Sequence, residues 1–144
     1  MASVSQPVRR SLTDIVKAGA LGAVVAAVIN VLLYLLGRAL GSFPDTALSP
    51  SGRPVDAVAA ALISILGVAG GTLVYAIMSR RLDAAKANRW FLIVAIVVLV
   101  LMIPTPFGVA GAPVSQIVIM EIMHLVAGLS AIYFLTRWRQ PSGR

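Results

Sequence analysis

The chain has 144 residues, of which 59% are hydrophobic and 12% are charged, and its net charge is +7. A soluble domain is about half apolar and one quarter charged, so this composition is typical of an integral membrane protein. The sequence contains no cysteine, which excludes disulfides, thiolate metal sites and a cysteine nucleophile. The basic residues flank long apolar runs instead of interleaving with aromatic residues, so we expect them to set membrane topology, and we expect no nucleic-acid binding.

The first apolar run predicts a membrane-spanning helix over residues 15–40, after a polar cytoplasmic tail at residues 1–14. Thr13 or Asp14 is expected to cap this helix. An alternative is a secretory signal cleaved near Gly41, but the apolar stretch is longer than the roughly 7 to 15 residues of a signal core.

Three further membrane-spanning helices are predicted, at residues 55–79, 86–103 and 114–136. The segment between the first two helices contains several prolines and glycines, which predict a loop. Asp83 is expected to cap the third helix, and Pro104 and Pro106 are expected to end it. A short cytoplasmic tail is expected over residues 138–144, after a four-helix membrane domain at residues 15–137.

The fold class is therefore predicted to be all-α, a bundle of four transmembrane helices. Most basic residues fall on one side of this four-span arrangement, and only Arg38 and Arg53 fall on the other. The positive-inside rule then places both termini in the cytoplasm. Trp90 and Trp138 are expected at the cytoplasmic interface, where indole rings are favoured.

The last span carries the only glutamate and the only histidine of the chain, Glu121 and His124. They are three residues apart, so their side chains share one helix face. Asn30, Tyr34 and Ser64 fall at similar depth in the first two spans. The sequence therefore predicts one buried polar cluster of five residues, with the face of Glu121 and His124 packed against the first helix. Arg38 is expected either to reach toward Glu121 or to extend to water.

Three roles are open for this cluster. A carboxylate at the membrane centre costs roughly 2.5 to 3.5 kcal/mol, which the apolar residues of the same span offset at roughly 0.3 to 0.6 kcal/mol each. A structural, helix-clamping role is therefore favoured. The alternatives are a proton- or solute-handling carrier that uses Glu121 and His124, and a haem- or chlorophyll-bearing subunit with His124 as axial ligand.

Several specific enzymatic functions are disfavoured because the sequence lacks the residues that they need. A zinc enzyme ordinarily needs three protein ligands, and only Glu121 and His124 are available, so no metal site is predicted. No G-x-S-x-G motif occurs, and no catalytic residue is assigned. We expect no resident cofactor, apart from the haem or chlorophyll alternative at His124.

Small residues at spacings that allow close helix approach are expected to serve helix packing. They are Gly22, Ala26, Gly67, Gly71 and Gly128. Gly67 and Gly71 are four residues apart, the spacing that also favours helix dimerisation. Gly128 lies one turn below His124 and is expected to admit another helix or a flat ligand.

Four features together resemble one known pattern. The first span ends in VLLYLLGRALG, basic residues follow the second, prolines break the third, and the last contains MEIMHLVAGL. This pattern is similar to an uncharacterised family of small four-helix bacterial membrane proteins, domain of unknown function 6069. The resemblance covers about residues 15–137 and implies a four-helix membrane fold without an assigned activity.

We interpret the chain as a non-enzymatic, multi-pass protein of the bacterial plasma membrane that acts as a structural or accessory subunit. Its expected partners are the lipid bilayer and either other membrane subunits or a second copy of the chain.

Overall fold

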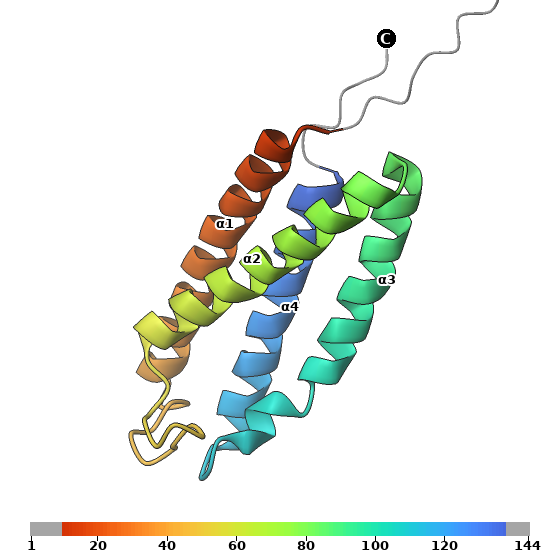
Figure 1. The fold of residues 1–144 in the computed structure, drawn as a ribbon. Helices are drawn as coiled ribbons and strands as arrows, with labels where there is room; N and C mark the ends of the chain where they lie inside the picture. Colours follow the sequence, from red (N-terminus) through yellow and green to blue (C-terminus); the bar gives the residue numbers. More distant parts are fainter. Residues whose placement is uncertain (1–9, 138–144) are drawn as a thin grey trace, which may run out of the picture.

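The computed structural model describes residues 10–137, which contain four long helices (Figure 1). Helix α1 comprises Leu12–Ala39, α2 Ala57–Arg81, α3 Ala84–Met102 and α4 Val114–Thr136. A short 3-10 helix, η1, comprises Thr105–Gly108. All four long helices, with η1 counted as an extension of α3, are long and apolar enough to cross a membrane. The chain is therefore an all-α, multi-pass membrane protein, as the sequence predicts.

Aspartate and serine side chains fix where three of the helices begin. Asp56 caps α2 by accepting a hydrogen bond from the amide of Ala59, and Asp83 caps α3 in the same way through Lys86. Asp83 was the expected cap. For α1 the expected caps, Thr13 and Asp14, are wrong, because Ser11 accepts from the amide of Asp14 and the helix begins earlier. An N-cap oxygen satisfies one of the amides that the first helical turn leaves unpaired.

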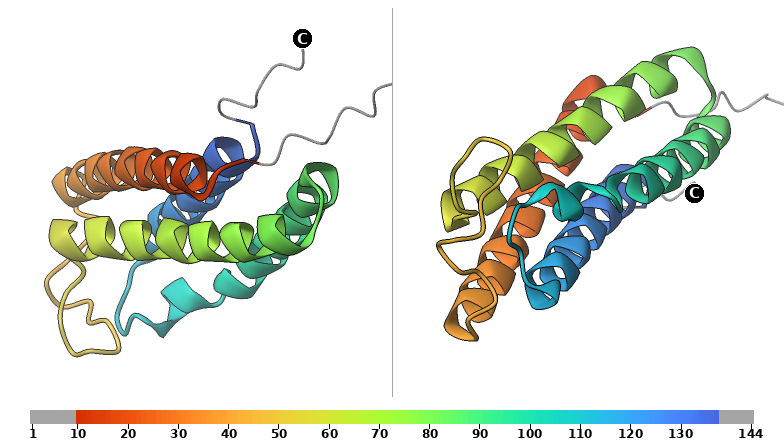
Figure 2. Two further views of the ribbon diagram at one scale, coloured as in Figure 1. Left: turned by 45° about the horizontal axis from the view of Figure 1, so that its top comes forward. Right: turned by 90° about the horizontal axis from the view of Figure 1, so that it is seen from below.

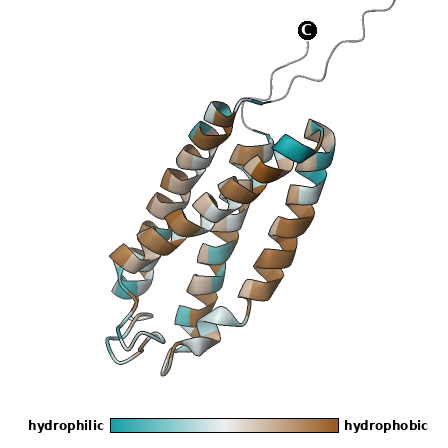
Figure 3. Cartoon of the chain, viewed as in Figure 1, coloured by the Kyte–Doolittle hydropathy of each residue, from teal (hydrophilic) through white to brown (hydrophobic). Residues whose placement is uncertain are grey.

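Helix α1 is the most deeply packed helix, and α3 is the most peripheral. Helix α1 packs along both α2 and α4, whereas α3 packs less extensively, along α2 and α4. The buried residues of α3 are Ala87 and Phe91, both near its start. Its remaining apolar surface faces outward along most of its length (Figure 3), as expected for a helix in contact with lipid.

The bundle has one closed end and one open end. At the closed end α2 turns directly into α3, and the rings of Tyr75 and Phe91 pack edge to face with centroids 5.2 Å apart. Leu135 of α4 and Ile15 of α1 belong to the same core cluster. From that turn α2 and α3 separate toward the opposite, open end, where the 41–56 loop and η1 lie (Figures 1 and 2).

The 41–56 loop folds back over the open end. Leu48 exchanges two backbone hydrogen bonds with Ala110, each 2.9 Å long, so this loop is joined to the connection between α3 and α4. Phe43 of this loop is buried against Tyr34 of α1, with ring centroids 5.0 Å apart. The loop is thus an ordered part of the bundle.

The predicted tails extend beyond the described residues. Arg9, Trp138, Arg139 and Arg144, which contribute to the predicted topology, lie outside them. The cytoplasmic placement of both tails stays a prediction.

Candidate functional site

Asn30 is the centre of the polar contacts between helices. It is 2% exposed, and its amide nitrogen donates to the hydroxyl of Ser64 at 2.8 Å and to the backbone carbonyl of Met123 at 3.0 Å. The Ser64 hydroxyl in turn donates to the carbonyl of Ala60 at 2.6 Å. These bonds connect α1, α2 and α4 at one level. The structure therefore brings together the Asn30 and Ser64 pair that the sequence placed at similar depth.

Tyr34 and Arg38, which follow Asn30 on α1, make other contacts. Tyr34 is buried in an apolar cluster, where its ring packs against that of Phe43. Arg38 does not reach Glu121: it donates to the carbonyl of Phe43 at 2.6 Å and forms an ion pair with Asp45 at 2.7 Å. Both side chains stabilise the start of the 41–56 loop.

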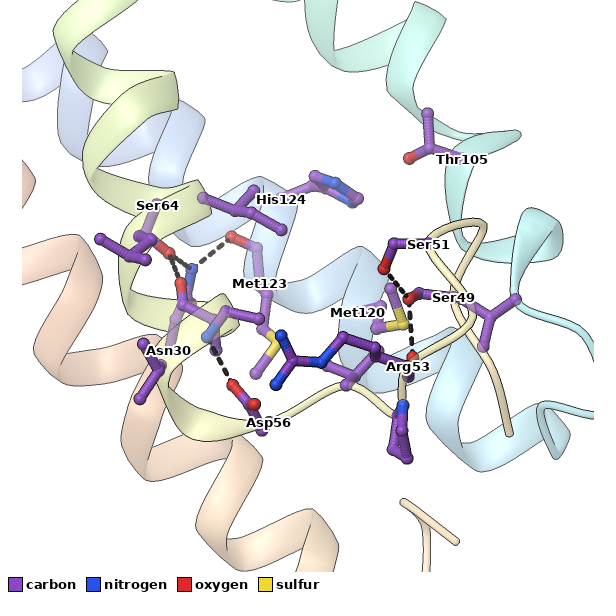
Figure 4. Close-up of a pocket in the computed structure, with 18 of the residues that line it drawn as sticks. Asn30, Ser49, Ser51, Arg53, Asp56, Ser64, Thr105, Met120, Met123 and His124 are labelled. Atoms are coloured by element: carbon purple, nitrogen blue, oxygen red, sulfur yellow. Dashed lines mark hydrogen bonds between the residues drawn. The ribbon is translucent and has the colours of Figure 1, made fainter. Parts of the chain in front are cut away.

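Glu121 and His124 do not join the Asn30 contacts. In Figure 4 the imidazole of His124 is directed away from Asn30 and Ser64. The Oε1 atom of Glu121 and the Nδ1 atom of His124 are buried and have no hydrogen-bond partner within residues 10–137. Met123, between them, contributes its carbonyl to Asn30 instead. The reason is the rotation of α4 about its axis, which turns the Met123 face toward α1.

The face that carries Glu121 is turned toward α3. Gly128 lies two helical turns from Glu121, on the same side of α4. A Cβ atom at Gly128 would lie 2.6 Å from a methyl group of Leu99 in α3. We expected this face to pack against the first helix, but α3 contacts it. The space beside Gly128 is filled by Leu99, so it is not open to a flat ligand there.

The other predicted packing residues differ in how tightly they are enclosed. Gly22 lies against the ring of Phe134, Ala26 is fully buried, and Gly71 lies near Ala131 and Phe91. Gly67 has no atom of another segment within 4 Å of its Cβ position, so it faces outward. Gly19 of α1 was not singled out from the sequence, yet it is among the tightest contacts, because a Cβ there would overlap the side chain of Thr72.

A pocket of about 770 Å³ lies at the open end, between α2 and α4 and against the 41–56 loop (Figure 4). Leu62 and Ile63 of α2, Met102 of α3 and Ala127 of α4 contribute apolar wall. Asn30, Ser64 and His124 supply polar groups along the wall, so three of the five predicted cluster residues line it. Glu121 and Tyr34 do not. A concave, mainly apolar space with a few polar groups is typical of a small-molecule site.

The loop supplies the charged part of the pocket, which the sequence analysis missed. Arg53 and Asp56 line it at the start of α2, and Ser49 and Ser51 line it from the preceding turn. Their position in a loop gives no periodic signal, and only the fold over the helix ends brings them to the pocket. The residues that the structure describes hold no group of three or more histidine, cysteine or acidic side chains arranged to bind a metal.

Comparison with known protein families identifies one of unknown function. The model of a family of unknown function, DUF6069, matches residues 10–141. The chain belongs to this family. The match covers most of the chain and confirms the resemblance seen in the sequence, while the description of the family assigns no activity. No curated protein and no solved structure matches the chain.

Proposed function

We propose that this DUF6069 member is a non-enzymatic accessory protein of the bacterial plasma membrane that holds an amphiphilic molecule in the pocket at its open end. The pocket carries the proposal: its volume of about 770 Å³ falls within the range of small-molecule sites, and apolar side chains form much of its wall. An amphiphile matches a space with hydrocarbon walls and polar groups at the loop.

The surroundings of His124 support a binding role over a catalytic one. A nucleophile activated by histidine needs its hydroxyl or thiol within hydrogen-bond reach of the ring. No hydrogen bond to His124 occurs within residues 10–137, and its buried Nδ1 has no orienting carboxylate. The ring therefore lines the pocket as a polar group able to contact a bound molecule.

The orientation that we propose has both termini in the cytoplasm. The closed end carries Arg80 and Arg81 at the end of α2, and Lys86 and Arg89 at the start of α3. The open end carries Arg38 and Arg53, and Arg38 is neutralised by Asp45. The positive-inside rule supports a cytoplasmic closed end. The pocket then opens in the outer leaflet.

A pocket-filling variant tests the binding role. Ala127 lines the pocket, and Phe at this position occupies part of its volume. Ala127→Phe is compared with Ala69→Phe, whose parent alanine is exposed on α2 outside the pocket. We expect native mass spectrometry after mild detergent extraction to find a bound small molecule on the wild type and on Ala69→Phe, but not on Ala127→Phe. Wild-type protein that retains no small molecule overturns the proposal.

The accessory role has its own readout. Chemical cross-linking in membranes followed by mild purification is expected to recover the chain with another membrane subunit, and the same recovery is expected for Ala69→Phe. A chain that is cross-linked to no other protein and purifies as a ligand-bound monomer contradicts the accessory role and leaves the binding role intact.

A second candidate is a proton-linked carrier that uses Glu121. The buried, unpartnered Oε1 of Glu121 and Nδ1 of His124 favour it, because ionisable groups inside a membrane bundle mark transport sites. Proton flux into proteoliposomes tests it with Glu121→Gln, and Ser115→Ala, at an exposed position of the same helix, is the control. Flux that requires Glu121 establishes the carrier, whereas equal flux from all three proteins excludes it.

A further inference from the structure

The pocket rim carries two opposite charges that are not paired with each other. Arg53 and Asp56 are both exposed and both line the pocket. The ion pairs found within residues 10–137 are Arg38 with Asp45 and Asp83 with Lys86, so neither rim residue belongs to one. Asp56 uses its Oδ1 atom to cap α2, at 2.7 Å from the amide of Ala59. Its second oxygen and the Arg53 guanidinium are available to a ligand.

A closed turn presents Arg53 to the pocket. The amide of Ser49 donates to the carbonyl of Arg53 at 2.9 Å, and the Ser49 hydroxyl donates to the same carbonyl at 2.6 Å. The amide of Gly52 donates back to the carbonyl of Ser49 at 2.8 Å. The backbone that carries the guanidinium is therefore ordered before a ligand binds, which reduces the entropy lost on binding.

The pocket runs from this charged rim into the membrane. Asp56 stands at the start of α2, and Ile63 and Ser64 line the same pocket about two helical turns further along. Seven residues of helix span about 10 Å. The polar part thus lies at the level of the helix end, where lipid headgroups lie, and the apolar part lies at the level of the acyl chains.

The balance of rim charges selects among headgroups. A purely anionic headgroup is attracted by Arg53 but repelled by Asp56. A purely cationic headgroup is attracted by Asp56 but repelled by Arg53. A zwitterionic headgroup satisfies both, because its phosphate accepts from the guanidinium and its ammonium donates to the carboxylate. A primary ammonium keeps N–H donors for Asp56, whereas a trimethylated one has none.

We propose that the occupant of the pocket is an aminophospholipid of the surrounding bilayer, with its phosphate at Arg53, its primary ammonium at Asp56 and one acyl chain between α2 and α4. This inference rests on the proposed binding function and names the ligand class for the same site. It makes the 41–56 loop a headgroup-recognition element and α2 and α4 the walls of an acyl-chain groove.

The test is competition between headgroups. The full chain is placed in nanodiscs with equal amounts of phosphatidylethanolamine, phosphatidylcholine and phosphatidylglycerol, and the lipids that stay bound are counted by native mass spectrometry. We expect phosphatidylethanolamine to exceed each of the others by about threefold, the range of one exposed charge interaction. Equal retention of the three lipids overturns the headgroup proposal.

Variants that each remove one charge test whether the rim residues cause the headgroup preference. Asp56→Asn removes the anion and keeps an N-cap residue, so α2 is preserved, and we expect phosphatidylglycerol to become at least equal to phosphatidylethanolamine. Arg53→Gln is expected to lower retention of all three phospholipids. Arg80→Gln removes a cation of the closed end, outside the pocket, and is expected to leave the lipid preference unchanged. An unchanged preference in Asp56→Asn overturns the assignment.

The outcomes separate the two proposals. The wild type could retain lipid without headgroup preference while Ala127→Phe loses it. This result supports the proposed binding function and contradicts the headgroup inference. Wild-type protein that retains no small molecule ends both. A bound mass that matches a free fatty acid, or a second copy of this chain on the pocket face, also overturns the aminophospholipid assignment.

Discussion

The two ends of this bundle are built from the same helices but are filled differently. At the closed end, Tyr75, Phe91 and Leu135 are almost fully buried and fill the space where α2, α3 and α4 meet. At the open end, α2 and α3 lie apart, and Ala59, Ala60 and Ala127 are among the residues that line the pocket. Apolar side chains line the space at both ends. The difference teaches that the separation of α2 from α3, rather than hydrophobicity, determines where this membrane protein keeps an accessible volume.

The hydrogen bonds between helices also differ between the closed end and the open end. Tyr75 donates to Asn88 at 2.6 Å, which joins α2 to α3 at the closed end. Asn30 joins α1, α2 and α4 next to the pocket, and α3 takes no part. Helix α3 is thus held at one end and separated from α2 at the other. Four substitutions test this contrast, and they are given in order of expected effect.

The largest effect is expected from a side chain added where α1 and α2 touch. Gly19→Leu would force Thr72 and α2 away from α1, and overpacking of this kind costs about 1 to 3 kcal/mol. Gly67→Leu is the matched control, because nothing lies within 4 Å of its Cβ position. Unfolding in mixed detergent micelles measures both free energies. Equal stability of the two variants would contradict the close contact at Gly19.

Loss of the Asn30 contacts is expected to have the next largest effect. Asn30→Ala removes two hydrogen bonds between helices, and such bonds contribute about 0.6 kcal/mol each on average inside membranes. We expect the free energy of unfolding to fall by about 1 kcal/mol. Ser64→Ala, measured alone and in the double variant, should show non-additive losses with Asn30→Ala. Simple additivity would show that the two side chains do not interact.

A smaller loss is expected from Tyr75→Phe. The substitution removes the hydroxyl that donates to Asn88 and keeps the ring contact with Phe91, so we expect a loss of about 0.6 kcal/mol. Asn88→Ala should reproduce it, and the double variant should add little. Cross-linking between cysteines introduced at the open ends of α2 and α3 shows whether α3 separates further. Unchanged stability in Tyr75→Phe would contradict this anchoring of α3.

The smallest effect is expected at the Arg38–Asp45 ion pair in the 41–56 loop. The hydrogen bond from Arg38, followed by its charge, holds the pKa of Asp45 below its usual value. The stabilisation is present above the unfolded pKa of Asp45 and is lost as pH falls through the lower, folded pKa. Carboxyl NMR titration should therefore show Asp45 titrating below pH 3.8 in the wild type and nearer that value in Arg38→Gln. Identical titration curves would show that the pair does not form in solution.

Helix number and approximate helix extent were predictable from the sequence because hydropathy depends on residue type alone, whereas the family was recognised by resemblance to its sequence pattern. The run from Val114 to Thr136 was placed at the bounds that the structure gives, since Pro113 and the basic residues after Thr136 delimit it. The Asn30–Ser64 contact could also be predicted, because the depth of a residue in the membrane follows from its position along the span.

The orientation of each helix about its own axis was not predictable from the sequence. Apolar residues cover all sides of α2 and α4, so the sequence carries little information on which side faces which neighbour. The same depth argument grouped Glu121 and His124 with Asn30, although His124 only shares the pocket lining with Asn30 and neither residue joins its hydrogen bonds. The pocket rim depends on the fold of the 41–56 loop, and no periodic pattern in that proline-rich segment indicates that Arg53 and Asp56 reach the pocket.

The pairing of Leu48 with Ala110 also has a consequence for the order of assembly. The two residues are far apart in sequence, and their hydrogen bonds join the first helical hairpin to the second. They can form only once the chain has passed through α3, because Ala110 follows that helix. Exchange protection of the Leu48 amide would therefore report that the connection between α3 and α4 has joined the 41–56 loop.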